Sequence, residues 1–166
     1  MAELEDQLVS ELWARDVRFL MGQQSATPPL LTPASLIAAL AQSENARVRL
    51  SLIPVFLRHP EYFTEAEKAD EALLTHPSQL VLRFYYTAAV ILQSKYWERL
   101  NNLFSRQTRL PDLFSKKIGV SLSEDLNESL LNLSKRHQIL SGHFINWLGT
   151  YEHAAERLIK HMEKFG

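Results

Sequence analysis

One uninterrupted stretch constrains the fold more than any other part of the chain. From Ser78 to Arg106 the sequence contains neither glycine nor proline, and the eleven residues from Phe84 to Ser94 carry no charge. Apolar side chains recur there at helical spacing and spread to neighbouring positions, which is typical of a helix buried on most sides. We therefore predict one long buried central helix over about residues 79–106, with Ser78 as its N-cap.

The remaining segments also favour helices. Residues 3–21 carry an apolar stripe at helical spacing, and Gly22 follows where a helix commonly ends. No run shows the sustained alternation of a half-buried strand. The expected fold is an all-α, single-domain helical bundle of about seven helices spanning residues 1–166. Its parts are N-terminal helices with an αα-hairpin (1–77), the central helix (78–107) and C-terminal helices (111–166).

The composition indicates the cellular compartment in which we expect the protein. The chain has no cysteine, which excludes disulfides, thiolate metal sites and a cysteine nucleophile and fits a reducing environment. The first twelve residues are acidic and amphipathic, unlike a secretory signal. Arg83 and Lys95 bound the uncharged window, which is too short to cross a bilayer. We expect a cytoplasmic protein that does not use a membrane as a partner.

The loops that usually hold nucleotides, nucleophiles or zinc are missing. The sequence lacks a G-x-G-x-x-G motif, a Walker-type loop, a G-x-S-x-G elbow and H-E-x-x-H. The Glu-x-x-His pairs of a di-iron helical bundle are absent as well. We therefore predict neither a cofactor nor a metal.

Residues 95–117 form the one basic segment, with six Lys or Arg against two Asp or Glu. On a continuous helix, Lys95, Arg99 and Arg106 share a face, and Arg109 follows in the next loop. These four cations are candidate contacts for nucleic acid or phosphate, with neighbouring aromatic side chains available for base stacking. The alternative interpretation is an ordinary solvated helix face.

Arg136 and His143 are separated by six residues, Arg136 being followed by a polar one. This R-x6-H arrangement resembles the motif of the HEPN superfamily, all-helical proteins that include ribonuclease toxins. The resemblance implies that Arg136 stabilises charge and that His143 transfers a proton during RNA cleavage. The structural alternative places Arg136 near a helix C-terminus, where cations are favoured.

Polar and aromatic side chains gather around a break near Gly149. Asn146, Trp147 and Tyr151 are candidate contacts for a partner, because such mixed groups are common where a partner docks. The alternative is a turn between helices with Trp147 in the core.

Together these observations favour a small, non-enzymatic protein-binding subunit or regulator, with an antitoxin-like partner of a prokaryotic enzyme as one form. The alternatives are a HEPN-like ribonuclease of the toxin type that uses Arg136 and His143, and a nucleic acid-binding regulator that uses the basic helix face. A homodimer is compatible with all three functions.

Overall fold

The structure is a computed structural model that describes residues 2–20, 28–105 and 107–165, and these ranges contain helices and no strand. The all-α prediction is confirmed. The helical segments outnumber the seven expected, because Ser51 and Tyr96 each separate two helices that follow one another directly. The elements are α1 (Ala2–Ala14), α2 (Pro33–Gln42), α3 (Ala46–Leu50), α4 (Leu52–Arg58), the 3₁₀ turn η1 (Pro60–Tyr62), α5 (Phe63–Ala72), α6 (His76–Lys95), α7 (Trp97–Leu103), α8 (Ser115–Ile118), α9 (Leu126–Ser141) and α10 (Trp147–Phe165).

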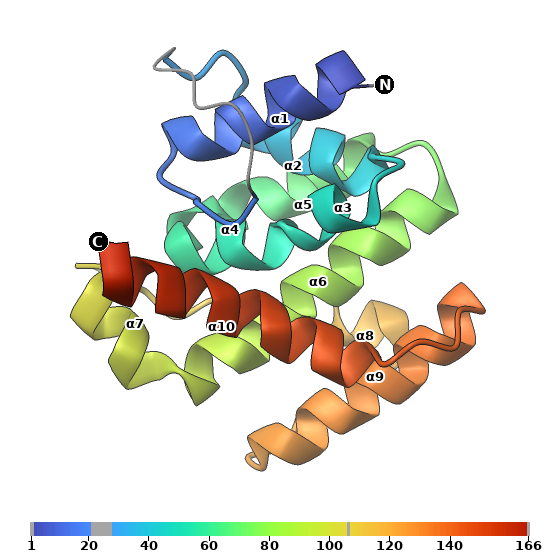
Figure 1. Ribbon diagram of the computed structural model, residues 1–166. Helices are drawn as coiled ribbons and strands as arrows, with labels where there is room; N and C mark the ends of the chain where they lie inside the picture. Colours follow the sequence, from blue (N-terminus) through green and yellow to red (C-terminus); the bar gives the residue numbers. More distant parts are fainter. Residues whose placement is uncertain (1, 21–27, 106, 166) are drawn as a thin grey trace.

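Helix α6 is the buried centre of the molecule (Figure 1). It contacts α2, α4 and α5 from the N-terminal part, and α8, α9 and α10 from the C-terminal part. Leu82, Phe84 and Tyr86 are fully buried along it. The buried apolar side chains form one cluster that extends from α1 to α10.

The central helix is shorter than the sequence predicts and has a different cap. Thr75, rather than Ser78, is the N-cap, because its hydroxyl accepts from the Ser78 amide. The helix ends at Lys95, and Tyr96 has φ −107° and ψ 24°, outside helical geometry. The chain resumes as α7 and becomes extended at Phe104. This bend accompanies a contact with α10, where the Tyr96 hydroxyl donates to Glu152 Oε2 at 2.9 Å.

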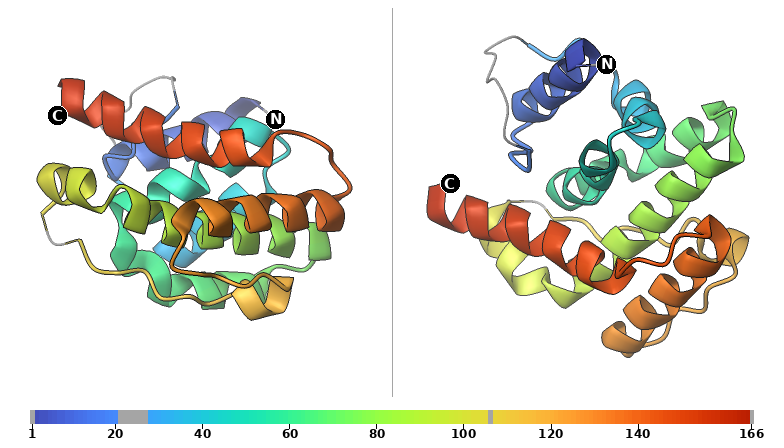
Figure 2. Two further views of the ribbon diagram at one scale, coloured as in Figure 1. Left: turned by 90° about the horizontal axis from the view of Figure 1, so that it is seen from below. Right: turned by 45° about the vertical axis from the view of Figure 1, so that its right-hand side comes forward.

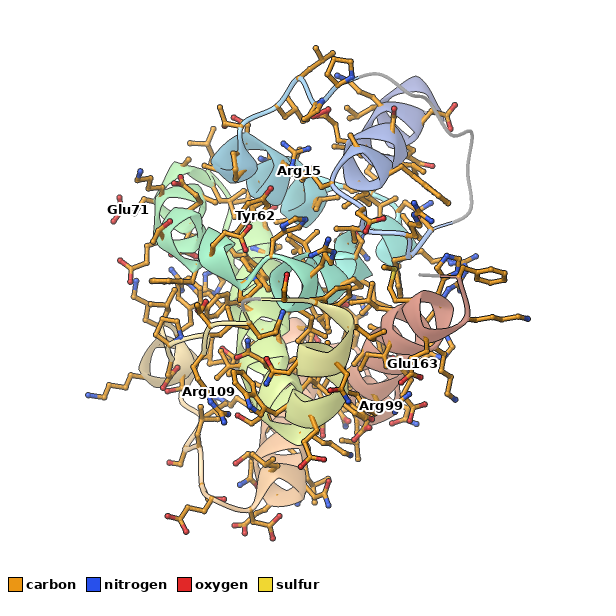
Figure 3. All side chains as sticks on the ribbon, turned by 90° about the vertical axis from the view of Figure 1, so that its left-hand side faces the viewer. Arg15, Tyr62, Glu71, Arg99, Arg109 and Glu163 are labelled. Atoms are coloured by element: carbon orange, nitrogen blue, oxygen red, sulfur yellow. The ribbon has the colours of Figure 1, made fainter. Side chains whose placement is uncertain are left out.

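Helix α1 ends at Ala14, well before the predicted residue 21. Asp16 takes the left-handed conformation with φ 61°, and its amide donates to the Trp13 carbonyl at 3.0 Å. Asp16 thus performs the helix-ending role assigned to Gly22, which lies outside the described residues. Arg15 then donates to the Tyr62 hydroxyl at 3.2 Å, linking α1 to η1 (Figure 3).

Helix α10 closes the core on the C-terminal side. Its buried face carries Tyr151, Leu158 and Ile159, and it lies across α9 and α7 (Figure 2). Within the described ranges, no helix has both the length and the apolar character needed to cross a membrane.

Candidate functional site

A pocket of about 360 Å³ opens where the C-terminus of α2, the first half of α6 and the α9–α10 loop meet. We call it the α6 pocket. Its lining consists of Ala41, Gln42, Ser43, Arg49, His76, Pro77, Ser78, Leu80, Val81, Tyr85, His137, Leu140, Ser141, His143 and Trp147. None of these residues is acidic, and residues 129–151 contain no Asp or Glu.

His137 forms part of the wall at the core side and is only 3% exposed. Its ring stacks on Phe84 at a centroid distance of 4.2 Å and on Trp147 at 3.6 Å. This burial lowers the pKa of His137 to about 3, with a smaller contribution from repulsion by His143. His137 is therefore a neutral imidazole at physiological pH.

A buried hydrogen bond fixes which nitrogen of His137 carries the proton. The Tyr151 hydroxyl lies 2.5 Å from His137 Nδ1, and it has no other hydrogen-bond partner within the described residues. We assign Nδ1 as the acceptor, because the reverse direction would leave the hydroxyl proton of the fully buried Tyr151 without an acceptor, whereas Nε2 keeps contact with solvent. The proton of neutral His137 then resides on Nε2, which makes no hydrogen bond in the part of the chain that the structure describes.

Tyr85 contributes a second neutral donor. It is 5% exposed, lines the pocket, and its hydroxyl has no hydrogen-bond partner among the described residues. Neither Tyr85 Oη nor His137 Nε2 is among the fully enclosed polar atoms that lack a partner, so both keep some contact with solvent, and both residues line the pocket. Burial raises the pKa of Tyr85 to about 12, and the nearby charge of Arg49 opposes this rise. Tyr85 thus remains protonated.

The rim of the pocket is basic. Arg49 is half-buried and donates from Nη1 to the Ser43 carbonyl at 2.8 Å, which holds its guanidinium at the pocket. His76, in the first turn of α6, and His143, in the α9–α10 loop, are exposed lining residues. Because the N-terminus of α6 adds partial positive charge, the whole entrance favours negative charge.

Two exposed apolar side chains are close in sequence to residues that line this entrance. Leu74 is 97% exposed and precedes His76 by two residues, and Phe144 is 79% exposed and follows His143 directly. They are the two most exposed large apolar side chains in the described ranges. Each of the two segments that carry these side chains therefore also contributes a residue to the pocket lining.

The structure does not bring the HEPN-like pair together in one site. Arg136 Nε donates to the Ile118 carbonyl of α8 at 2.9 Å, and its guanidinium lies against Gly119. His143 instead lines the α6 pocket, whose lining does not include Arg136. The two side chains have different neighbours on different elements.

The three predicted partner contacts have structural roles. Asn146 is exposed, and its Oδ1 accepts from the Gly149 amide at 2.9 Å, which caps α10. Trp147 is 8% exposed and forms a wall of the pocket, and Tyr151 is fully buried behind it. The core interpretation of Trp147 is thus the one that the structure shows.

The basic segment faces α10 along a surface that we call the α10 seam, formed by Lys95, Tyr96 and Arg99 with Glu152, Glu156 and Glu163. Lys95 Nζ lies 2.5 Å from Glu152, and Arg99 makes two hydrogen bonds to Glu163, at 2.7 and 3.1 Å (Figure 3). The hydrogen bond from Arg99 lowers the pKa of Glu163. Carboxylates of the protein therefore already occupy the positions that phosphates would take.

The other two predicted cations lie apart from this seam. Arg109 has its guanidinium 3.8 Å from the Trp97 ring centroid and donates to Ser94 Oγ at 3.2 Å. Figure 3 shows Arg109 separated from Arg99 and Glu163. Arg106 lies outside the described residues. Among the described cations, Arg109 thus does not continue the stripe that Lys95 and Arg99 begin.

Sequence reasoning missed the α6 pocket, since its polar residues come from three helices: Arg49 from α3, His76 and Tyr85 from α6, and His137 from α9. The one available signal was the absence of carboxylates from residues 129–151. Among the described residues, no group of three or more histidines and carboxylates is arranged to hold a metal ion. Comparison with family models, curated proteins and solved structures finds no match to this chain.

Proposed function

We propose that this chain is a non-enzymatic protein-binding subunit or regulator whose partner docks at the entrance of the α6 pocket. The observation that carries this proposal is that Leu74 and Phe144, the two most exposed large apolar side chains among the described residues, lie within two residues of the lining residues His76 and His143. Burying a leucine or phenylalanine side chain contributes about 1.5–3 kcal/mol. An apolar pair beside a concave surface is a common anchor for a partner.

The charge of this surface defines the partner's chemistry. The pocket lining includes Arg49 and three histidines but no carboxylate, and the run 129–151 contains no Asp or Glu. A partner surface with apolar side chains bordered by Asp or Glu would complement it. An antitoxin-like regulator is one case of this function, and the cysteine-free sequence favours the cytoplasm as its location.

We leave catalysis out of the proposed function because Arg136 and His143 do not converge. Arg136 is held by the carbonyl of Ile118, so it would have to leave α8 to act together with His143. The same reasoning places nucleic acid binding second, since Lys95 and Arg99 are already paired with Glu152 and Glu163.

The test begins with tagged protein in an extract of the source cells, from which a stoichiometric protein partner is purified and its affinity measured. Phe144→Gln and Leu74→Gln should each weaken that affinity about tenfold, through lost apolar burial. The matched controls are Phe165→Gln and Leu30→Gln, which remove equally apolar side chains that are 61% and 78% exposed elsewhere.

Equal losses in the controls would show that the partner binds another surface. Recovery of nucleic acid without a protein would overturn the proposed function and favour the basic segment instead. Circular dichroism of all four variants checks that the helices are retained.

A further inference from the structure

We infer that the α6 pocket binds a small organic monocarboxylate, with an apolar or aromatic body held in the pocket and a carboxylate that accepts hydrogen bonds from Tyr85, His137 and Arg49. This inference goes beyond protein docking, because it concerns the pocket interior rather than the exposed side chains at its entrance.

The first support is the presence of two buried donors without acceptors. Tyr85 and His137 are 5% and 3% exposed, yet Tyr85 Oη and His137 Nε2 make no hydrogen bond in the described part of the chain. Both atoms keep some solvent access, so water can satisfy them in the free protein and a ligand group would take the place of that water. Both groups open onto one pocket, and their rings lie 5.8 Å apart between centroids. A single ligand group can therefore satisfy both.

The second support is that the protein presents donors rather than acceptors. The hydrogen bond from Tyr151 leaves His137 Nε2 protonated, and the guanidinium of Arg49 can only donate. The Tyr85 hydroxyl has no acceptor of its own in the described residues. The complementary ligand group therefore carries several lone pairs, as a carboxylate or a phosphate does.

The charge of the pocket favours a carboxylate over a phosphate. Arg49 is the one lysine or arginine in the lining, and no acidic residue lines the pocket to oppose the ligand. One guanidinium balances a single negative charge, whereas a phosphate monoester carries nearly two at neutral pH. A carboxylate also offers two oxygens to the two neutral donors.

The apolar walls of the pocket determine the size and polarity of the rest of the ligand. Leu80, Val81, Leu140 and Trp147 supply apolar surface beside the donors. The cavity volume of about 360 Å³ lies within the range of small-molecule sites. A compact aryl or alkyl acid fits this combination of size and surface.

The experiment uses isothermal titration calorimetry on the full chain with phenylacetate, phenyl phosphate and the neutral amide phenylacetamide. Phenylacetate should bind, and phenylacetamide should bind at least about tenfold more weakly because it lacks the charge. Tyr85→Phe removes one hydroxyl and should weaken phenylacetate binding about tenfold. Tyr62→Phe, which removes a hydroxyl that accepts from Arg15 outside the pocket, is the matched control and should leave binding unchanged.

Arg49→Gln should abolish the preference for phenylacetate over phenylacetamide, and Arg49→Lys should restore part of it. Absence of binding by all three probes would overturn the inference. Tighter binding of phenyl phosphate, with the same loss in Tyr85→Phe, would overturn the choice of a carboxylate. Binding that Tyr85→Phe and Arg49→Gln leave unchanged would place the probe elsewhere. Since Leu74 and Phe144 stay intact throughout, these outcomes are independent of the protein-docking test.

Discussion

The α10 seam and the α6 pocket both gather cations and aromatic rings, but they use them in opposite ways. In the seam, Lys95 and Arg99 each meet a carboxylate of α10. In the pocket, Arg49 has a carbonyl as its hydrogen-bond partner, and no carboxylate shares the lining. The difference shows that the density of cations in the sequence does not tell which of them lack a carboxylate partner in the folded chain.

The sequence alone favours the basic segment over Arg49 as a candidate binding surface, and this contrast reverses that ranking. Six basic residues within residues 95–117 stand out in the sequence, whereas the acidic partners of Lys95 and Arg99 lie more than fifty residues further along the chain. Arg49 lies outside this basic segment, and no sequence pattern singles it out as a binding residue. Pairing is a property of the folded chain, so charge counts over a window cannot show it.

The largest expected effect is on the free energy of unfolding, and it compares a tryptophan of the pocket wall with one beside the α10 seam. Trp147→Ala should lower the free energy of unfolding by about 3–5 kcal/mol, since the ring is buried and stacks on His137. Trp97→Ala should cost clearly less, because Trp97 is half-buried and covered by Arg109 at the surface. Urea denaturation of both variants measures this. Equal losses would mean that the pocket wall is no more deeply packed than the surroundings of the seam.

The pH dependence of stability should come from the pocket. The pKa of His137 falls from 6.5 to about 3 on folding, so between these pH values the unfolded chain binds a proton that the folded chain does not. The contribution is therefore complete above pH 6.5 and is lost as the pH falls toward 3. From pH 7.5 to pH 5 we expect a loss of about 2 kcal/mol in the free energy of unfolding.

Urea titrations at several pH values test this expectation. His137→Gln should flatten the slope of stability against pH, whatever its effect on absolute stability. His153→Gln, which changes an exposed histidine of α10, is the control and should keep the wild-type slope. A wild-type slope in His137→Gln would assign the titration to other groups.

The smallest effect should appear when a seam cation is released. Glu163→Gln frees Arg99 from its two hydrogen bonds and should raise the salt concentration needed to elute the protein from heparin. Glu124→Gln makes the same change in net charge at an exposed residue that forms no ion pair in the described ranges. A larger shift for Glu163→Gln would show that pairing conceals a polyanion-binding cation, and equal shifts would reduce the effect to net charge.

Much of the fold follows from local patterns. The uncharged run in α6 predicts a buried helix because few other elements can hide so many apolar side chains, and Thr32 caps α2 as a threonine before proline should. The break at Tyr96 does not follow, since it accompanies a hydrogen bond to Glu152, 56 residues away. The left-handed turn at Asp16 is similarly hidden, because a glycine nearby is the more usual choice.

The candidate site is less predictable than the fold. Tyr85 belongs to an apolar helix and reads as a core residue, which its burial supports. Its free hydroxyl becomes evident only when the surrounding helices show that no acceptor is near. His137 is equally ambiguous, because its tautomer depends on a tyrosine from another helix.

The hydrogen bond from Tyr151 to His137 has an evolutionary consequence. Tyr151 is fully buried behind Trp147 and is not part of the pocket lining, yet it decides whether His137 presents a donor or an acceptor there. By the inference drawn above, a phenylalanine at position 151 would leave His137 Nδ1 without this partner and let His137 present either a donor or an acceptor to a ligand, with every residue of the pocket lining unchanged. Such a change in specificity would come from a residue outside the pocket lining, and a comparison of lining residues alone would miss it.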